Sequence, residues 1–101
     1  MKQKTKQSQT VWKYVLKAEE TQDIEMPKDY SVMSVGVQDD DIVIWVLVDP
    51  LYKDTEICRV KTYGTGWPMN ADSDRYRFVG TSQIKSGLVF HIFVRRRDRD
   101  T

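Results

Sequence analysis

The sequence predicts a single all-β domain, an antiparallel sandwich or small barrel of about six to seven strands. Residues 42–48 are seven consecutive apolar residues, most of them β-branched, between an acidic triplet and Asp49-Pro50. Such a run is too short to cross a bilayer as a helix, which needs about 20 residues, and is typical of a strand covered on both faces. Other β-rich segments recur at a spacing of roughly 8–12 residues with turn signals between them. No segment shows sustained helical periodicity.

Four strands are expected in the first half of the chain. Apolar residues alternate with lysines over residues 12–17, which fits a half-exposed strand, and a second short element around Ile24 ends at Pro27. From Tyr30 onward apolar residues alternate with small or polar ones, which predicts a strand with one buried face. Because the triplet Asp39–Asp41 then makes a tight reversal, we expect residues 30–48 to form a β-hairpin.

Three more strands are expected in the second half. Residues 57–63 are rich in β-forming residues, and residues 76–84 form a strand with a bulge at Gly80. Residues 88–94 are nearly all apolar, so this segment should be the other central strand. Because strands adjacent in sequence tend to pair, a meander is the simplest topology. The only segments in which we consider a short helix are residues 50–56 and 69–75.

The cysteine count and the start of the sequence favour a reducing compartment. Cys58 is the single cysteine, so no intramolecular disulfide can form. The first residues do not have the pattern of a secretory signal, which favours the cytoplasm. Since no apolar segment is long enough to span a bilayer as a helix, we expect no membrane association.

The charges are distributed unevenly along the chain. The net charge is +1, but residues 1–17 carry five lysines and no acid, whereas residues 18–94 carry thirteen acidic and seven basic side chains. We expect residues 1–10 to be a disordered basic arm, residues 11–94 the β domain, and residues 95–101 a charged, solubilising tail. An acidic body disfavours nucleic acid binding on the fold, so only the arm and tail could contact phosphates.

The segment Gly64-Thr65-Gly66-Trp67-Pro68 is the best local candidate for a binding site. Gly64 and Gly66 permit positive φ and a close approach of the backbone to a ligand. Trp67 offers a flat anchoring surface of the kind enriched at interface hot spots, and Pro68 stiffens the exit. The alternative is a structural turn whose tryptophan packs back on the sheet. The segment lacks the lysine and the following helix of a phosphate-binding loop.

His91 is the second candidate, as the only histidine of the chain. It alternates with Val89 and Phe93 on one strand face, where it could contact a ligand or act as a general base. Spacing identifies no nucleophile or orienting partner, so a hydrogen-bonded structural histidine is the alternative. Since no set of converging polar groups stands out, we expect a protein that is not an enzyme.

The remaining polar residues fit structural roles. Asp39–Asp41 lacks the alternating spacing of a calcium loop, and no glycine or terminal glutamate completes one around Asp72 and Asp74. Cys58 and His91 alone make no zinc site, and Cys58 fits a small buried apolar position. We therefore expect no metal and no cofactor.

Four motifs occur in an order that resembles a known family. They are Trp45-x-Leu47-Val48-Asp49-Pro50, Tyr63-Gly64-Thr65-Gly66-x-Pro68, Phe78-Val79-Gly80-Thr81-x-Gln83 and Leu88-Val89-x-His91-x-Phe93, preceded by Ile24-x-Met26-Pro27. Over about residues 12–94 the chain resembles a family of small uncharacterised proteins from tailed phages and prophages. The resemblance implies a phage or prophage origin and a setting in the cytoplasm of a bacterial host, and it assigns no activity or catalytic residue. The Lys-rich arm and the Arg-rich tail depart from the family.

Two functions from different classes follow as hypotheses. The first is a non-enzymatic phage-encoded accessory protein, a protein–protein interaction module that could inhibit or modulate a host or defence component. Its partner would be a host or phage protein, its contact surface the loop 64–68, and exposed edge strands would make it a homo-oligomer. The second is a small-ligand protein, for example one that binds or sequesters a nucleotide, with Gly64, Thr65, Gly66 and Trp67 as the cradle and Thr81 or His91 nearby.

Overall fold

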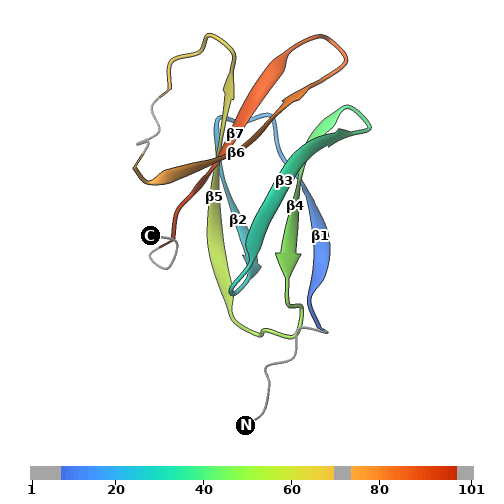
Figure 1. Cartoon of the computed structure of the whole chain (residues 1–101), viewed down its shortest axis with the longest axis vertical. Helices are drawn as coiled ribbons and strands as arrows, with labels where there is room; N and C mark the ends of the chain where they lie inside the picture. The colour runs from blue at the N-terminus through green and yellow to red at the C-terminus, as the bar shows by residue number, and fades with distance from the viewer. Residues whose placement is uncertain (1–7, 70–73, 98–101) are drawn as a thin grey trace.

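Seven antiparallel strands form two sheets that face each other (Figure 1). The computed structural model describes residues 8–69 and 74–97. The strands are β1 (Thr10–Val15), β2 (Thr21–Pro27), β3 (Ser31–Gln38), β4 (Asp41–Val48), β5 (Thr55–Gly64), β6 (Tyr76–Gln83) and β7 (Val89–Arg95). The described part of the chain contains no helix, and hence none long and apolar enough to cross a membrane. The predicted all-β class and strand number are confirmed.

The strand order corrects the predicted topology. One sheet has the order β1-β4-β3 and the other the order β2-β5-β7-β6, so the molecule is a sandwich and not a closed barrel. Only β3–β4 and β6–β7 are hairpins of sequence neighbours, and the expected meander is wrong. The chain instead crosses between the sheets after β1, β2 and β4. These crossings place the apolar inner faces of two small sheets against each other, which a single flat meander cannot do.

The hairpin predicted for residues 30–48 is confirmed, and its turn is short. Asp39 and Asp40 have φ angles of 51° and 64°, and Gln38 pairs with Asp41, the first residue of β4. Positive φ at both central residues is what a two-residue hairpin turn of type I′ requires, and aspartate tolerates this conformation better than most residues. The reversal therefore uses only the first two residues of the acidic triplet.

The two long apolar runs are the interior strands of their sheets, as predicted. β4 is the middle strand of three, and β7 lies between β5 and β6. Alternate residues of β4, β5 and β7 point inward and are almost fully buried: Ile44, Val46, Val48, Cys58, Val60, Ile92 and Val94. On the outer face of β4 the Trp45 ring covers Gly36, where an added Cβ would lie 2.5 Å from the indole. Glycine at this position therefore lets β4 be covered on both faces.

Bulges and loops fix the remaining geometry. The register between β6 and β7 shifts between Phe78 and Gly80, so the predicted bulge falls at Val79, directly before Gly80. Gly80 then faces β3 so closely that a Cβ would lie 2.5 Å from Cγ1 of Val35. The short helix allowed for within 50–56 does not form, because the Tyr52 amide donates to the Asp49 carbonyl oxygen at 3.1 Å in a turn. Residues 70–73, within the second loop where a helix was allowed for, lie outside the described residues.

The domain extends past the boundary expected at residue 94. Arg95 ends β7, and Arg97 lies over the ring of Tyr30 with its Cζ 3.9 Å from the ring centroid. Nη1 of Arg97 also donates to the Tyr30 carbonyl oxygen at 2.6 Å. The first residues of the expected solubilising tail are therefore part of the fold. Residues 1–7 of the expected arm and residues 98–101 lie outside the described part.

Candidate binding site

The segment from Gly64 to Trp67 forms a tight turn at the end of β5. The Trp67 amide donates to the Gly64 carbonyl oxygen at 3.0 Å. Gly66, the third residue of the turn, has a φ of +89°, the conformation that a type II turn reserves for glycine. The Thr65 amide donates to the Val89 carbonyl oxygen at 3.2 Å. This bond holds the turn against the start of β7.

Two threonine hydroxyls engage both ring nitrogens of His91. Oγ1 of Thr65 lies 2.8 Å from Nε2, and Oγ1 of Thr81 lies 2.9 Å from Nδ1. Thr81 is directly opposite His91 in the β6–β7 pair, whereas Thr65 reaches it from the turn after β5. In a neutral ring one nitrogen donates and the other accepts, and a hydroxyl can serve either role. His91 therefore joins three segments and fixes the turn.

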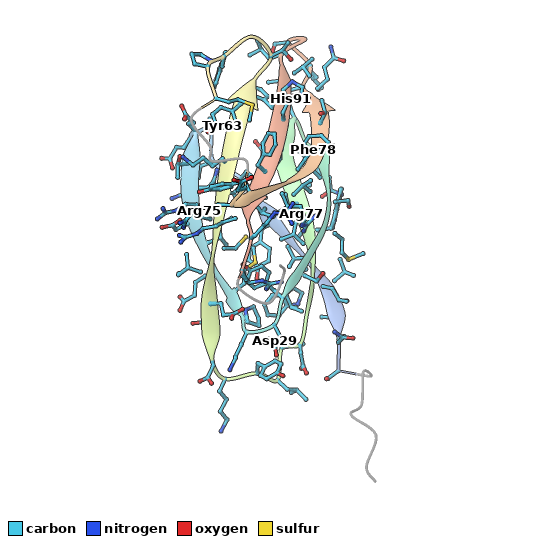
Figure 2. The ribbon with its side chains drawn as sticks, turned by 60° about the vertical axis from the view of Figure 1, so that its left-hand side comes forward. Asp29, Tyr63, Arg75, Arg77, Phe78 and His91 are labelled. Atoms are coloured by element: carbon cyan, nitrogen blue, oxygen red, sulfur yellow. The ribbon has the colours of Figure 1, made fainter. Side chains whose placement is uncertain are left out.

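An aromatic cluster lies next to His91 on the outer face of the four-stranded sheet (Figure 2). Tyr63 is opposite His91 in the β5–β7 pair. The Phe93 ring contacts Tyr63 with centroids 6.1 Å apart and Phe78 with centroids 5.4 Å apart. These edge and tilted contacts bind three strands together below the turn. The His91 hydrogen bonds thus start from a rigid part of the sheet.

Trp67 packs back on the sheet and still remains half exposed. A Cβ at Gly64 would lie 2.6 Å from Cε2 of Trp67, so the indole rests directly on the bare Gly64 backbone. The Trp67 ring meets Phe90 edge-on, with centroids 5.9 Å apart. Half of Trp67, 50%, stays accessible. The sequence left open whether Trp67 packs on the sheet or is exposed as an anchor. In the structure its side chain is packed on one side and exposed on the other.

Trp67 also lines a cavity of about 330 Å³ at this end of the sandwich. The connection from β1 to β2, the β3–β4 turn, the β6–β7 turn and the end of β5 surround it. Its apolar lining comes from Ile42 of one sheet, Phe90 of the other, and the connections between strands, which contribute Leu16, Ala18, Trp67, Ile84 and Leu88. Small-molecule and anchor-residue sites are commonly concave, apolar and of roughly 300–1,000 Å³.

The connection from β1 to β2 is held rigidly at the edge of this cavity. The buried Gln22 amide accepts from the Lys17 amide through Oε1 and donates to the Lys17 carbonyl oxygen through Nε2, both at 3.0 Å. The Leu16 amide donates to the Ile42 carbonyl oxygen of one sheet. The Thr62 amide of the other sheet donates to the Glu20 carbonyl oxygen. The wall is therefore tied to both sheets.

Thr62 places an unused polar atom in the cavity wall. Its Oγ1 is one of two buried side-chain polar atoms in the described residues that have no hydrogen-bond partner, the other being the Tyr63 hydroxyl. Thr62 lines the cavity, whereas Tyr63 faces the opposite side of β5 with His91. A buried hydroxyl without a partner is unfavourable, so such an atom marks a place where the fold is not optimised for stability alone.

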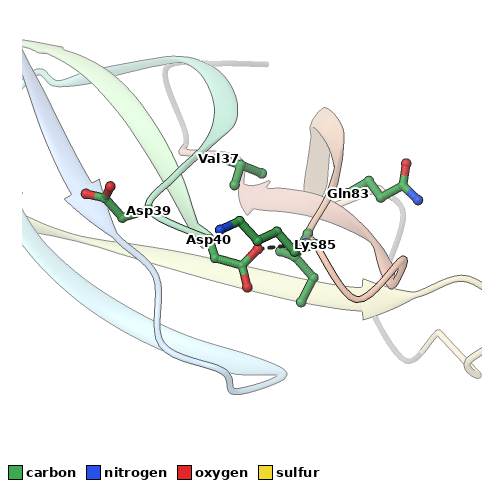
Figure 3. Close-up of a pocket in the computed structure, with 6 residues that line it drawn as sticks. Val37, Asp39, Asp40, Gln83 and Lys85 are labelled. Carbon is green, nitrogen blue, oxygen red and sulfur yellow. Dashed lines mark hydrogen bonds between the residues drawn. The ribbon is translucent and has the colours of Figure 1, made fainter.

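A shallower groove of about 600 Å³ continues from the cavity between the two hairpin turns (Figure 3). It shares Asp40 and Ile84 with the cavity. The Lys85 amide donates to Oδ1 of Asp40 at 2.7 Å, which ties the β6–β7 turn of one sheet to the β3–β4 turn of the other. The cavity and the groove therefore lie side by side at this end of the molecule.

The structure brings together the residues that the sequence analysis proposed as a site. Thr65 and His91 are in direct contact, Trp67 is carried by the same turn, and Thr81 completes the cluster. The glycines serve the turn itself, since Gly64 makes room for Trp67 and Gly66 supplies the positive φ. They do not form an open cradle for a ligand.

Sequence reasoning missed the cavity and its acidic edge. Glu19 and Glu20 come from the crossing between the sheets, Asp40 comes from the hairpin turn, and Asp41 begins β4. Two acidic pairs next to predicted strand ends were the available signal. Their meeting depends on the strand order, which local patterns do not encode.

The other candidate ligands for metals have structural positions. Asp39 and Asp40 form the hairpin turn, and Asp72 lies outside the described residues. Cys58 is 1% exposed, and its burial raises the pKa of the thiol to about 11. Across residues 8–69 and 74–97, no group of three or more histidine, cysteine, aspartate and glutamate side chains is placed to hold a metal ion.

Fold and site together define a small β-sandwich protein with a hollow, loop-bounded end. The chain belongs to the family described as "Domain of unknown function (DUF7352)", whose model matches residues 7–101. No curated protein and no solved structure matches the chain. The resemblance to small proteins of tailed phages and prophages stays a prediction.

Proposed function

We propose that this protein is a non-enzymatic protein–protein interaction module whose contact surface is the hollow end around Trp67. The observation that carries the proposal is that Trp67 is half exposed yet fixed, at the edge of a cavity that can receive a partner's side chain. Aromatic side chains next to pockets are typical hot spots of interfaces. An anchor that is already ordered loses little conformational entropy on binding, which strengthens association.

The state of His91 supports a binding role over a catalytic one. Both ring nitrogens are engaged by threonine hydroxyls, and these bonds position the turn that carries Trp67. A general base needs a nitrogen directed at the proton of a substrate. Following the resemblance noted in the sequence, the partner would be a phage protein or a host or defence component in the cytoplasm of a bacterium, which the protein would inhibit or modulate.

A comparison of two tryptophan variants tests the proposal. Tagged wild type, Trp67→Ala and Trp12→Ala are purified gently from a bacterial host, and the bound proteins are measured by quantitative mass spectrometry. Trp12 is the matched control, because it is 40% exposed and belongs to β1, where it lines a separate open groove of about 600 Å³ and not the cavity. A partner retained by wild type and Trp12→Ala and lost from Trp67→Ala supports the proposal. The same proteins on all three baits, with equal melting temperatures, would overturn it.

A small-ligand protein is the second candidate, and the cavity volume favours it. A volume of about 330 Å³ suits a small organic molecule. A nucleotide fits poorly, because four carboxylates line the cavity and would repel its phosphates, and because Trp67 already covers Gly64. A panel of small molecules in a thermal-shift assay tests this candidate, since a ligand that binds only the folded state raises the melting temperature.

Self-association is proposed separately, through pairing of β1, an edge strand of the three-stranded sheet. Val11 and Val15 of this strand are 47% and 51% exposed. Exposed apolar edge strands pair readily with another copy. Native mass spectrometry over a concentration series gives the stoichiometry directly, and a monomer at every concentration would exclude it.

A further inference from the structure

We propose that the hollow end takes an extended peptide segment that carries an apolar side chain next to a lysine or arginine. The inference rests on the proposed function and names the chemistry of the partner. Two features of the site carry it: the contrast between the apolar lining and the acidic edge of the cavity, and the position of the groove beside the cavity, with which it shares Asp40 and Ile84.

The cavity selects for an apolar group in its interior. Seven apolar side chains line it, including Trp67 and Phe90 in edge contact. Leu88 is 58% exposed and Trp67 is 50% exposed, so part of this lining faces water in the free protein. An apolar side chain that enters would remove this surface from water, which favours binding.

The edge of the cavity selects for positive charge. Glu19, Glu20, Asp40 and Asp41 line it, and Lys17 is the one basic residue among the described residues that do. The groove adds Asp39 and Lys85, which leaves this end with five carboxylates against two ammonium groups. Clustered charge of one sign steers an opposite charge toward the site.

Three of the acidic side chains are available to a partner. Asp40 already accepts a hydrogen bond from the Lys85 amide. Within the described part of the chain, the carboxylates of Glu19, Glu20 and Asp41 make no ion pair or side-chain hydrogen bond, and all three residues are exposed. A lysine or arginine beside an apolar anchor would meet these carboxylates, and it could also lie over the exposed Trp67 ring in a cation–π contact.

The shape of the surface favours a peptide over a compact cation. The cavity and the groove share Asp40 and Ile84, and Val37 and Gln83 line the groove beside them (Figure 3). An extended segment covers about 3.3 Å per residue, so a few residues would span both hollows. A small organic cation would fill the cavity alone and leave the groove empty.

The test is a selection of peptides on the full-length protein. Random nonapeptides displayed on phage are selected on wild type, on E19K/E20K, and on E25K/D54K, which changes the net charge equally away from the hollow end. Peptides selected on wild type should combine lysine or arginine with a large apolar residue. A synthetic copy should bind E19K/E20K on the order of tenfold more weakly and E25K/D54K unchanged, and it should shift the Trp67 indole signal in NMR spectra.

The outcomes separate this inference from the proposed function. Selected peptides that are apolar, lack a basic residue and still require Trp67 would overturn the charge preference and leave the interaction module standing. A set of peptides that binds Trp67→Ala as well as wild type would overturn both. Binding of n-octylammonium at the cavity without any selected peptide, or dimerisation through the Lys-rich arm that E19K/E20K abolishes, would overturn the peptide as the occupant.

Discussion

The core is covered differently at the two ends of the sandwich. At one end the β2–β3 turn and the last residue of the described chain close the core. Tyr30 is 3% exposed, and Arg97 lies over its ring, binds its carbonyl oxygen and approaches Glu56 at 3.6 Å. Figure 2 places Asp29 at this end, where its amide donates to the Glu56 carboxylate at 3.2 Å.

The other end keeps a cavity between the two sheets where the first end has a packed ring. The hollow nearest the first end is a separate open groove of about 600 Å³, lined by residues that include Trp12, Pro27 and Tyr52. Its loops are just as well connected, through Gln22, His91 and the Asp40–Lys85 bond. Rigid walls around an unfilled apolar space are what a binding site needs and what a core built only for stability avoids. The difference shows that an end of the sandwich can have well-ordered loops without having a filled core. The predictions below test these two properties independently.

The largest effect on stability is expected at the closed end. Tyr30→Ala removes a buried aromatic ring and should lower the free energy of unfolding by about 3–5 kcal/mol. Trp67→Ala removes a half-exposed ring at the open end and should cost about 1 kcal/mol. Urea unfolding of both variants measures the difference. Equal losses for the two variants would contradict the contrast between the ends, and Tyr30→Phe controls for the hydroxyl.

Adding a methyl group under Trp67 should have the next largest effect. Gly64→Ala would place a Cβ 2.6 Å from the indole, so Trp67 must move. Overpacking of this kind costs about 1–3 kcal/mol, and partner binding should fall with it. Gly36→Ala is the matched control, because its Cβ would lie 2.5 Å from Trp45 on the outer face of the other sheet. It should cost similar stability and leave binding intact.

Removing one hydroxyl from His91 should cost less. Thr65→Val deletes the bond to Nε2 and should lower the free energy of unfolding by about 0.5–1.5 kcal/mol, and Thr65→Ser should restore it. The specific readout is the turn: the NMR signals of Gly66 and Trp67 should shift in Thr65→Val. If only the signals of β6 moved, His91 would not hold the turn.

The smallest effect is expected on the outer face of the four-stranded sheet, away from both ends. The Arg59 guanidinium donates to both carboxylate oxygens of Asp23, at 2.7 and 2.9 Å, and these hydrogen bonds lower the pKa of Asp23 below its ordinary 3.8. A pKa that is lower in the folded than in the unfolded protein stabilises the fold. This stabilisation is present at a pH above the unfolded pKa and is lost as the pH falls through the folded pKa. Both side chains are exposed, so solvent weakens the contribution. Unfolding curves of wild type and Asp23→Asn should differ at neutral pH and converge in strong acid.

Local patterns in the sequence were enough for the strands, the hairpin at residues 30–48 and part of the site. The turn at 64–67 was visible in its glycines, and Thr81 next to His91 follows from the β6–β7 hairpin. Thr65 next to His91 depends on the pairing of β5 with β7, which are not sequence neighbours. The contact of Arg97 with Tyr30 and the meeting of Glu20 with Asp40 at the cavity likewise depend on crossings between the sheets. Contacts between segments that are distant in the sequence produce no periodic pattern from which they could be predicted.

Site-specific photo-crosslinking in the bacterial host tests the central claim most directly. The photoreactive residue p-benzoylphenylalanine replaces Lys17, an exposed residue at the edge of the cavity, in one variant and Trp12 in another, so that Trp67 stays in place, and adducts are identified by mass after irradiation. We predict a partner adduct at position 17 that is absent at position 12 and reduced when E19K/E20K is added. Partner adducts at position 12 alone, or at both positions in equal yield regardless of E19K/E20K, would contradict the account.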